Sequence, residues 1–300
     1  GVLLIWGWQW LFLVNLPLAG LVIVLGIRSL PTTRPALTKP FDLLGMTTLA
    51  VALTGLTLGI NRLDTTAIGA SLVSAQVWPL LALALAAGAA FVWIEGRTTD
   101  PIIRLGQFGN RQLVLANFLS MGAGLGEAAM VFLPALAIAA FGVSQSRASF
   151  LLLPVVLAVA VGSPVGGRLL DRYGARPVVM AGTLLLAAGM FLLGLLGTNF
   201  VAFIVAGVCI GFGLASLLGA PIRYIVLGEA EPSERAAAQG VVTIATGVGQ
   251  LISGALIGAV AASQGGGVGG YSASYLFVGG AALILVLLSF GLKARKAGQK

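Results

Sequence analysis

A single acidic residue carries the most unusual chemistry in the sequence. Glu127 stands near the centre of the apolar run Leu113–Phe141, and among 9 acidic and 17 basic residues it is the only one inside a long apolar run. An ionised carboxylate is costly in a low-dielectric environment, so burial favours the protonated form and makes proton exchange possible near neutral pH. Glu127 is therefore the predicted site of proton coupling or solute contact, with a purely structural role between helices as the alternative.

A short polar segment between two apolar runs is the second candidate. It reads GGRLLDRYGARP over residues 166–177 and separates the runs Ala148–Gly167 and Val178–Gly197. A junction this short sends both flanking helices through the same slab, antiparallel to each other. Its charges are expected at the membrane surface, where exposed ion pairs stabilise little. A solvated membrane turn is the plain interpretation.

Other polar residues are weaker candidates. Asn117, Gln250 and Asn15 fall within apolar runs. They either line a cavity or form hydrogen bonds between helices, worth roughly 0.6–2 kcal/mol each. Arg223 follows Pro221, and we expect it either to pair with a nearby glutamate, Glu229 or Glu231, or to extend toward lipid headgroups. Three prolines can kink helices, and ordinary tolerance of proline in membrane helices explains them equally well: Pro134, Pro154 and Pro164.

The elements that position these residues are membrane helices. Hydrophobic residues make up 58% of the 300 residues and charged residues only 9%, whereas soluble domains carry about 25% charged residues. Nine apolar runs reach the roughly 17–25 residues that cross a bilayer. They are Leu11–Ile27, Leu43–Ile60, Val77–Ile94, Leu113–Phe141, Ala148–Gly167, Val178–Gly197, Phe200–Pro221, Ala236–Ala262 and Tyr271–Leu292. The predicted fold class is an all-α integral membrane protein.

Glycine is abundant within these runs, which favours close helix packing. The 43 glycines include five small-xxx-small pairs in apolar runs, namely Gly55/Gly59, Gly122/Gly126, Gly162/Gly166, Gly207/Gly211 and Gly254/Gly258. The glycine-rich stretch at 265–270 follows a membrane run and has no neighbouring lysine, so a flexible external turn is predicted there and not a phosphate-binding loop.

Several function classes are excluded by composition. The chain has no histidine and one cysteine, Cys209, so His-based catalysis, His or Cys metal sites and a disulfide framework within the chain are excluded, and no cofactor is expected. A membrane enzyme such as a lipid-linked transferase needs paired carboxylates, a metal site or a large interfacial loop. The sequence offers none of these, so an enzyme is not expected. The formal charge of +8 is dispersed among short loops, which argues against nucleic acid as a partner.

The basic residues predict the orientation. All but two of the 17 fall on alternate loops, the exceptions being Arg62 and Arg147. By the positive-inside rule, the C-terminus is cytoplasmic and Gly1 lies outside in a multi-pass protein of the cell (plasma or inner) membrane. Nine spans with an external start indicate that helices upstream are missing. The bias toward Ala, Gly, Leu and Arg suggests a bacterial source.

Three stretches carry a family resemblance. Residues 167–176 read GRLLDRYGAR, similar to the G-x-x-x-D-[RK]-x-G-[RK]-[RK] loop of the major facilitator superfamily, with Ala175 in place of one basic residue. Residues 8–20, WQWLFLVNLPLAG, resemble the entry to helix six of fourteen-span drug:proton antiporters of the EmrB/QacA type, with Gln9 at an Arg position. Residues 101–111, PIIRLGQFGNR, resemble the segment leading into their ninth helix.

The resemblance implies a fragment that carries helices six to fourteen of a major facilitator fold. Residues 1–28 would be the last helix of an incomplete N-terminal bundle, 29–110 two linker helices, and 111–300 the C-terminal six-helix bundle. The first five helices, with the family's antiporter motif, would be missing partners. The implied gating residues of the cytoplasmic loop, with Asp171 helping to hold the outward-facing state, are Gly167, Asp171, Arg172, Gly174 and Arg176.

The implied function is secondary active transport. The resemblance indicates proton-coupled export of hydrophobic or cationic small molecules (multidrug efflux, drug resistance) by alternating access, with the small-molecule substrate, protons and the lipid bilayer as partners. A facilitator carrier of another solute, such as a metabolite or siderophore, is the nearest alternative. A non-transporting membrane scaffold is a further one, although no soluble appendage is predicted.

Overall fold

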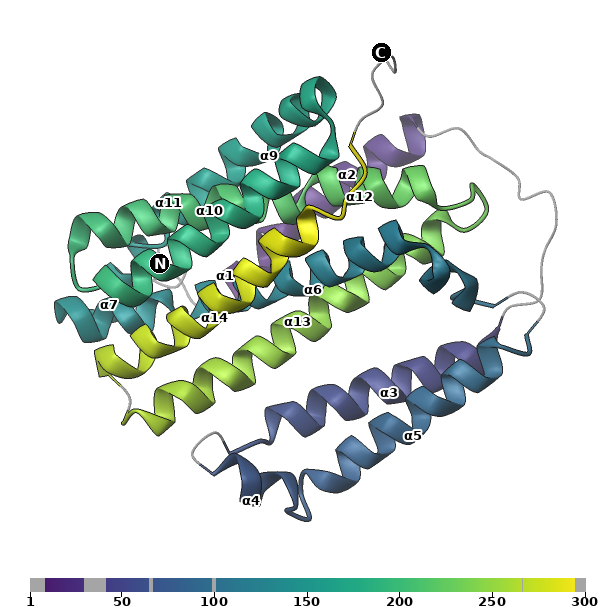
Figure 1. The fold of residues 1–300 in the computed structure, drawn as a ribbon, viewed down its shortest axis with the longest axis horizontal. Helices are drawn as coiled ribbons and strands as arrows, with labels where there is room; N and C mark the ends of the chain where they lie inside the picture. The colour runs from purple at the N-terminus through teal and green to yellow at the C-terminus, as the bar shows by residue number, and fades with distance from the viewer. Residues whose placement is uncertain (1–8, 30–41, 65–66, 99–100, 266, 295–300) are drawn as a thin grey trace. The chain divides into compact units, whose positions relative to one another are not determined.

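The described residues are almost entirely helical. The structure, a computed structural model, describes residues 9–29, 42–64, 67–98, 101–265 and 267–294, and these form helices and turns without a strand. Figure 1 shows the helices in chain order. The chain divides into two units, Gly1–Phe41 and Asp42–Lys300. In the second unit, helices are the expected solution because a lipid-facing backbone must satisfy its own hydrogen bonds.

The first unit contains two short helices, α1 (Trp10–Leu13) and α2 (Asn15–Ser29). The sequence predicted one full span over Leu11–Ile27, whereas α2 has 15 residues and a length of about 22 Å, below the roughly 30 Å of a bilayer core. The described chain therefore has eight helical segments long and apolar enough to cross a membrane, against nine predicted.

A helical hairpin opens the second unit. It consists of α3 (Leu43–Asn61), the short α4 (Ile68–Leu72) and α5 (Trp78–Glu95), followed by the 3-10 turn η2 (Leu105–Gly109). Asp42 caps α3 by accepting a hydrogen bond from the Gly45 amide at 2.8 Å. Gly55 and Gly59 let α3 approach α5 closely, because a Cβ on Gly55 would lie 3.0 Å from the Leu80 carbonyl oxygen.

The remaining helices form the bundle that holds Glu127. They are α6 (Arg111–Val131), α7 (Leu133–Phe141), α8 (Gln145–Phe150), α9 (Leu153–Tyr173), α10 (Ala175–Leu196), α11 (Phe200–Leu218), α12 (Ala220–Glu229), α13 (Arg235–Ser263) and α14 (Gly267–Ser289). Three apolar segments are each broken into two helices, and the second helix of each has proline at its start: Pro134, Pro154 and Pro221. Helix breaks thus accompany Pro134 and Pro154, whereas Pro164 lies inside α9, which continues through it.

The core of the bundle surrounds α6. Helix α6 packs against α11, α12, α13 and α14, while α10 packs against α11 and α14. Leu119, Leu136 and Ile210 are fully buried. Tyr275 of α14 is also fully buried, and its hydroxyl donates a hydrogen bond to the Ala129 carbonyl of α6 at 3.1 Å. This bond satisfies a polar group that would otherwise be costly in an apolar core.

The predicted polar interruption at 166–177 is shorter than expected. Helix α9 continues through Tyr173, and α10 begins at Ala175, so Gly174 alone forms the junction. Gly174 has φ of 84°, which an L side chain rarely adopts, and glycine allows the chain to turn there. The other eleven residues of the predicted loop are helical, because charged side chains at a helix end reach water without unwinding the backbone.

Candidate functional site

The structure joins two of the predicted polar residues. The Gln250 side chain of α13 donates a hydrogen bond from Nε2 to Glu127 Oε2 of α6 at 2.8 Å. Both residues are half-buried. Gln250 lies near the middle of α13, and Glu127 lies one turn before the end of α6 but near the centre of the apolar segment Arg111–Phe141. The carboxylate therefore has a neutral amide partner, and in the described part of the chain no salt bridge neutralises it.

Close backbone contact between α6 and α13 fixes the position of this pair. A Cβ on Gly124 would collide with the Thr246 carbonyl oxygen, and a Cβ on Gly249 with that of Met121. One turn beyond Gly249, Ser253 donates a hydrogen bond to the Leu125 carbonyl at 2.8 Å. Glycine at both positions is thus a geometric requirement for the crossing. The glycine pairs named from the sequence include neither of these two residues.

The chemistry available at this site is simple. A carboxylate with one amide donor can release or take up a proton, or attract a cationic solute. Nearby positions are apolar, since a Cβ on Gly126 would meet the side chains of Leu186 and Leu214 at 3.0 and 3.3 Å. A low-dielectric setting strengthens any electrostatic interaction that the carboxylate makes.

The other predicted cavity residues lie apart from this pair. Asn117 precedes Glu127 by almost three helical turns on α6, and its Oδ1 is buried without a hydrogen-bond partner in the described chain. Asn15 belongs to the first unit. Gln250 also lines a cavity of about 290 Å³ at the end of α3, and its lining residues are Ile60, Asn61, Leu63, Gln250, Leu251, Gly254 and Ala255.

The predicted gating residues surround the α9–α10 junction. Asp171 and Arg172 are exposed in the last turn of α9, where the Arg172 guanidinium lies 5.2 Å from the Tyr173 ring centroid, and Arg176 lies in the first turn of α10. Gly167 was expected to permit a tight helix approach, but a Cβ there would meet nothing within 4 Å. Only Gly174 has the backbone geometry that requires glycine.

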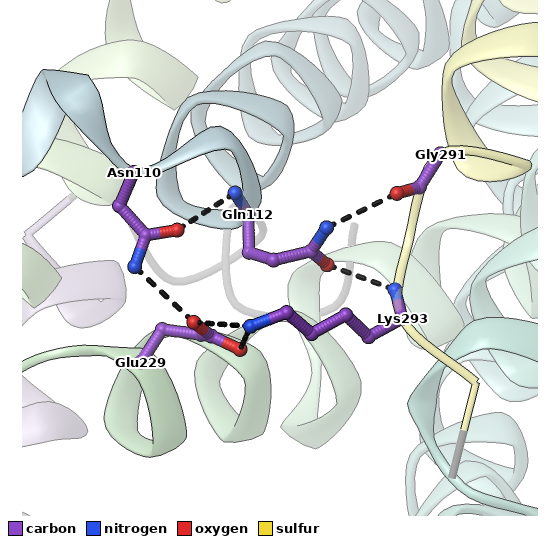
Figure 2. Close-up of polar contacts among 5 residues, drawn as sticks. All are labelled: Asn110, Gln112, Glu229, Gly291 and Lys293. Atoms are coloured by element: carbon purple, nitrogen blue, oxygen red, sulfur yellow. Dashed lines mark hydrogen bonds and ion pairs between the residues drawn. The ribbon is translucent and has the colours of Figure 1, made fainter.

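A polar cluster that the sequence analysis missed ties together the ends of α6, α12 and α14 (Figure 2). Lys293 Nζ forms a salt bridge with Glu229 at 2.6 Å, and Asn110 Nδ2 donates to the same carboxylate at 3.1 Å. The Gln112 amide donates to the Gly291 carbonyl at 3.1 Å and accepts from the Lys293 backbone amide at 2.9 Å.

This cluster corrects one prediction. Glu229 was a proposed partner of Arg223, but it pairs with Lys293, which is 64 residues distant in sequence. Arg223 instead uses its backbone carbonyl, which accepts a hydrogen bond from Gln239 at 3.2 Å. In the sequence, only the polar residues just before the run Leu113–Phe141 and just after the run Tyr271–Leu292 could have indicated this cluster.

The succession of apolar helices from α6 to α14 coincides with a known family. The protein-family model described as Major Facilitator Superfamily matches residues 113–300 of the sequence. The chain belongs to the Major Facilitator Superfamily. The family match and the helices of the described chain agree with the all-helical membrane fold that the sequence predicted.

Similar proteins come from bacteria. This facilitator chain is 28% identical over 250 residues to the uncharacterized MFS-type transporter YfiU of Bacillus subtilis, covering 82% of this chain and 48% of that protein. It is 30% identical over 261 residues to the multidrug resistance protein Stp of Mycobacterium tuberculosis, covering 86% and 48%. A triacylglyceride transporter of Mycolicibacterium smegmatis is 31% identical over 285 residues, covering 86% and 49%. The chain thus spans about half the length of these curated relatives.

Proposed function

We propose that this facilitator chain takes part in proton-coupled export of hydrophobic or cationic small molecules by alternating access. The observation that carries the proposal is the Glu127–Gln250 hydrogen bond at the α6–α13 crossing. A carboxylate inside an apolar span is a proton site by its chemistry, and it attracts a cation when it is ionised. One group that binds either a proton or a cation, but not both, is sufficient for exchange.

The hydrogen bond supplies a way for proton binding to change the helix contact. An amide N–H bonds an ionised carboxylate more strongly than a neutral carboxylic acid. Protonation of Glu127 therefore weakens its bond to Gln250. Near this hydrogen bond, Gly124 and Gly249 bring the backbones of α6 and α13 into contact. No side chain at these two positions holds the helices apart. Proton binding is expected to favour one arrangement of these helices over the other.

The wider architecture of the proposal follows the family resemblance. Residues 111–300 act as the C-terminal bundle, 29–110 as linker helices, and 1–28 with further N-terminal helices as the opposing bundle. Basic junctions such as Gly174–Arg176 face the cytoplasm, and Asp171 contributes to gating there. Single cysteines placed at Ala175 and Gln264, in a Cys209→Ala background, test the orientation, because a membrane-impermeant thiol reagent should reach them from opposite sides.

The central test replaces Glu127 with Gln, which keeps the shape and removes the charge. Inverted membrane vesicles are prepared from cells that produce the full-length parent protein. An imposed pH gradient drives uptake, and ethidium serves as the lipophilic cation. The Glu127→Gln variant should lose gradient-driven ethidium movement, by at least about tenfold if the lost interaction is worth 1.4 kcal/mol. Glu234→Gln, which also removes one carboxylate, is the matched control and should retain it. Undiminished coupled movement in Glu127→Gln would exclude Glu127 from the mechanism.

A second candidate is export of a neutral lipid. Two relatives carry the name triacylglyceride transporter, at 31% and 29% identity over 86% of this chain each. A triacylglycerol has no cationic group, so its binding would not depend on an ionised Glu127. Transfer of a fluorescent triacylglycerol between vesicles, equal in wild type and in Glu127→Gln without a pH gradient, would favour this candidate.

A further inference from the structure

Two carboxylates meet at the base of the α3–α5 hairpin. Glu95 is the last residue of α5 and is 3% exposed, while Asp42 is the residue that caps α3. Both side chains point toward Gly45. A Cβ at Gly45 would collide with Asp42 Oδ2 and lie 3.0 Å from Glu95 Oε1. Because Gly45 has no side chain, both carboxylates fit beside it.

Most of the oxygen atoms in this pair have no hydrogen-bond partner. Asp42 Oδ1 accepts the capping bond from Gly45, but Asp42 Oδ2 and both oxygens of Glu95 are buried without a partner in the described chain. The backbone amides of Ile102 and Ile103 interact with the Glu95 carboxylate, but neither has the distance and angle of a full hydrogen bond to it. Buried carboxylate oxygens are strong acceptors, so three unpaired ones in one place indicate a missing donor.

No basic side chain of the surrounding described segments supplies the missing charge. Arg97, just beyond α5, stacks on Trp93 with its guanidinium carbon 4.1 Å from the ring centroid. Arg104 pairs with Glu234, near the start of α13, at 2.8 Å. Two ionised carboxylates sharing one buried site repel each other, and the cost of burying them is not repaid by either arginine.

We propose that Asp42 and Glu95 hold one proton between them and form a proton-binding site separate from Glu127. The proton is taken up from hydronium in the aqueous phase, which leaves as water. It binds one carboxylate oxygen, and the resulting O–H donates a hydrogen bond to an oxygen of the other carboxylate. The pair then carries a single negative charge, which the dipole at the N-terminus of α3 stabilises. The site needs no metal ion or cofactor and does not depend on the transport function proposed above.

The pair lies at the joint between the hairpin and the bundle. Phe91 of α5, Ile103 and Val241 of α13 form a small buried cluster, with Leu49 of α3 and Ile244 packed against it. Loss of the shared proton would place two negative charges between the first turn of α3 and the last turn of α5. The repulsion would loosen the hairpin at the point where it meets α13, so the site makes this joint sensitive to alkaline pH.

Infrared spectroscopy of the whole chain in lipid nanodiscs tests the proposal directly. A protonated carboxyl group has a C=O stretching band that an ionised one lacks. All samples carry Glu127→Gln so that Glu127 contributes no such band. At neutral pH the band should be present in this background, absent after the additional change Glu95→Gln, and retained after Glu234→Gln. A spectrum without the band in all three samples would overturn the proposal.

A second variant and a second measurement keep the test independent of folding defects. Asp42→Asn preserves the helix cap, because Asn caps as well as Asp, and its amide can donate to Glu95, so this variant should also lose the band. The thermal midpoint, followed by the reaction of Cys209 with a thiol-reactive dye, should fall at alkaline pH in the parent and stay constant in Glu95→Gln. Stabilisation of the parent by sodium chloride over choline chloride, without the band, would assign the pair to a metal cation and overturn the proton assignment.

Discussion

The α6–α13 contact and the α3–α5 hairpin bring helices together by the same means but treat their buried acids differently. In both, glycines allow close backbone approach, at Gly124 and Gly249 in the first and at Gly55 and Gly59 in the second. Glu127 receives an amide hydrogen bond across its contact, whereas Glu95 has no partner in the described chain. Close packing therefore does not by itself satisfy polar groups. The first contact is complete with its own side chains, and the second calls for an added proton.

The largest loss of thermal stability is expected at the contact between the backbones of α6 and α13. Gly249→Ala places a Cβ against the Met121 carbonyl, and neither helix can shift without disturbing the Ser253 to Leu125 hydrogen bond. Overpacking of this kind costs about 1–3 kcal/mol. The thermal midpoint of the detergent-purified chain, measured by the reactivity of Cys209, should fall clearly.

A glycine two residues earlier provides the matched control. A Cβ on Gly247 would meet nothing within 4 Å, so Gly247→Ala adds a methyl group to the same helix without a collision. Its midpoint should be unchanged or slightly raised, since alanine is the better helix former. Equal losses in both variants would mean that glycine at 249 is not required by the crossing, and the distinction between the two contacts would fail.

A smaller effect is expected in the hairpin. A Cβ on Gly55 would lie 3.0 Å from the Leu80 carbonyl oxygen and 3.2 Å from the Ala84 amide nitrogen, which is tight but avoids a collision. The hairpin contacts the bundle only lightly, so α3 and α5 have room to separate by a few tenths of an ångström. Gly55→Ala should therefore lower the midpoint by less than Gly249→Ala does. A greater loss at Gly55 would show the hairpin to be the more tightly constrained contact.

The sequence predicted the elements better than their registers. Glu127 and Gln250 were both candidates because each interrupts an apolar run, which a single chain reveals by inspection. Their hydrogen bond depends on which turns of α6 and α13 lie side by side, and Gly124 and Gly249 set that register through a long-range contact that no local pattern encodes. The same reason hid Asp42 and Glu95, which stand at the ends of two runs and become partners only once the hairpin closes.

The predictions at the ends of the helices were wrong for a related reason. Residues 167–173 carry charges and were predicted as a turn, yet α9 includes them because its final turns extend beyond the apolar stretch. Glu229 was one of two candidate partners for Arg223, chosen by nearness in sequence, and its partner Lys293 follows α14. Sequence distance is a poor guide to ion pairs at the surface, where long side chains from several helices reach the same place.

The smallest effect is expected in the cluster that joins α6, α12 and α14. The Lys293 side chain is 67% exposed, and exposed ion pairs are worth about 0.2–1 kcal/mol. Lys293→Ala removes the side chain beyond Cβ and with it the salt bridge to Glu229, while the backbone bond to Gln112 and the Asn110 bond to Glu229 remain. The midpoint should fall slightly at low salt and match the wild type at high salt, since salt screens exposed charges. A loss as large as that of Gly249→Ala, or one unaffected by salt, would place the main constraint on the bundle in this polar cluster and not in the glycine crossing of α6 and α13.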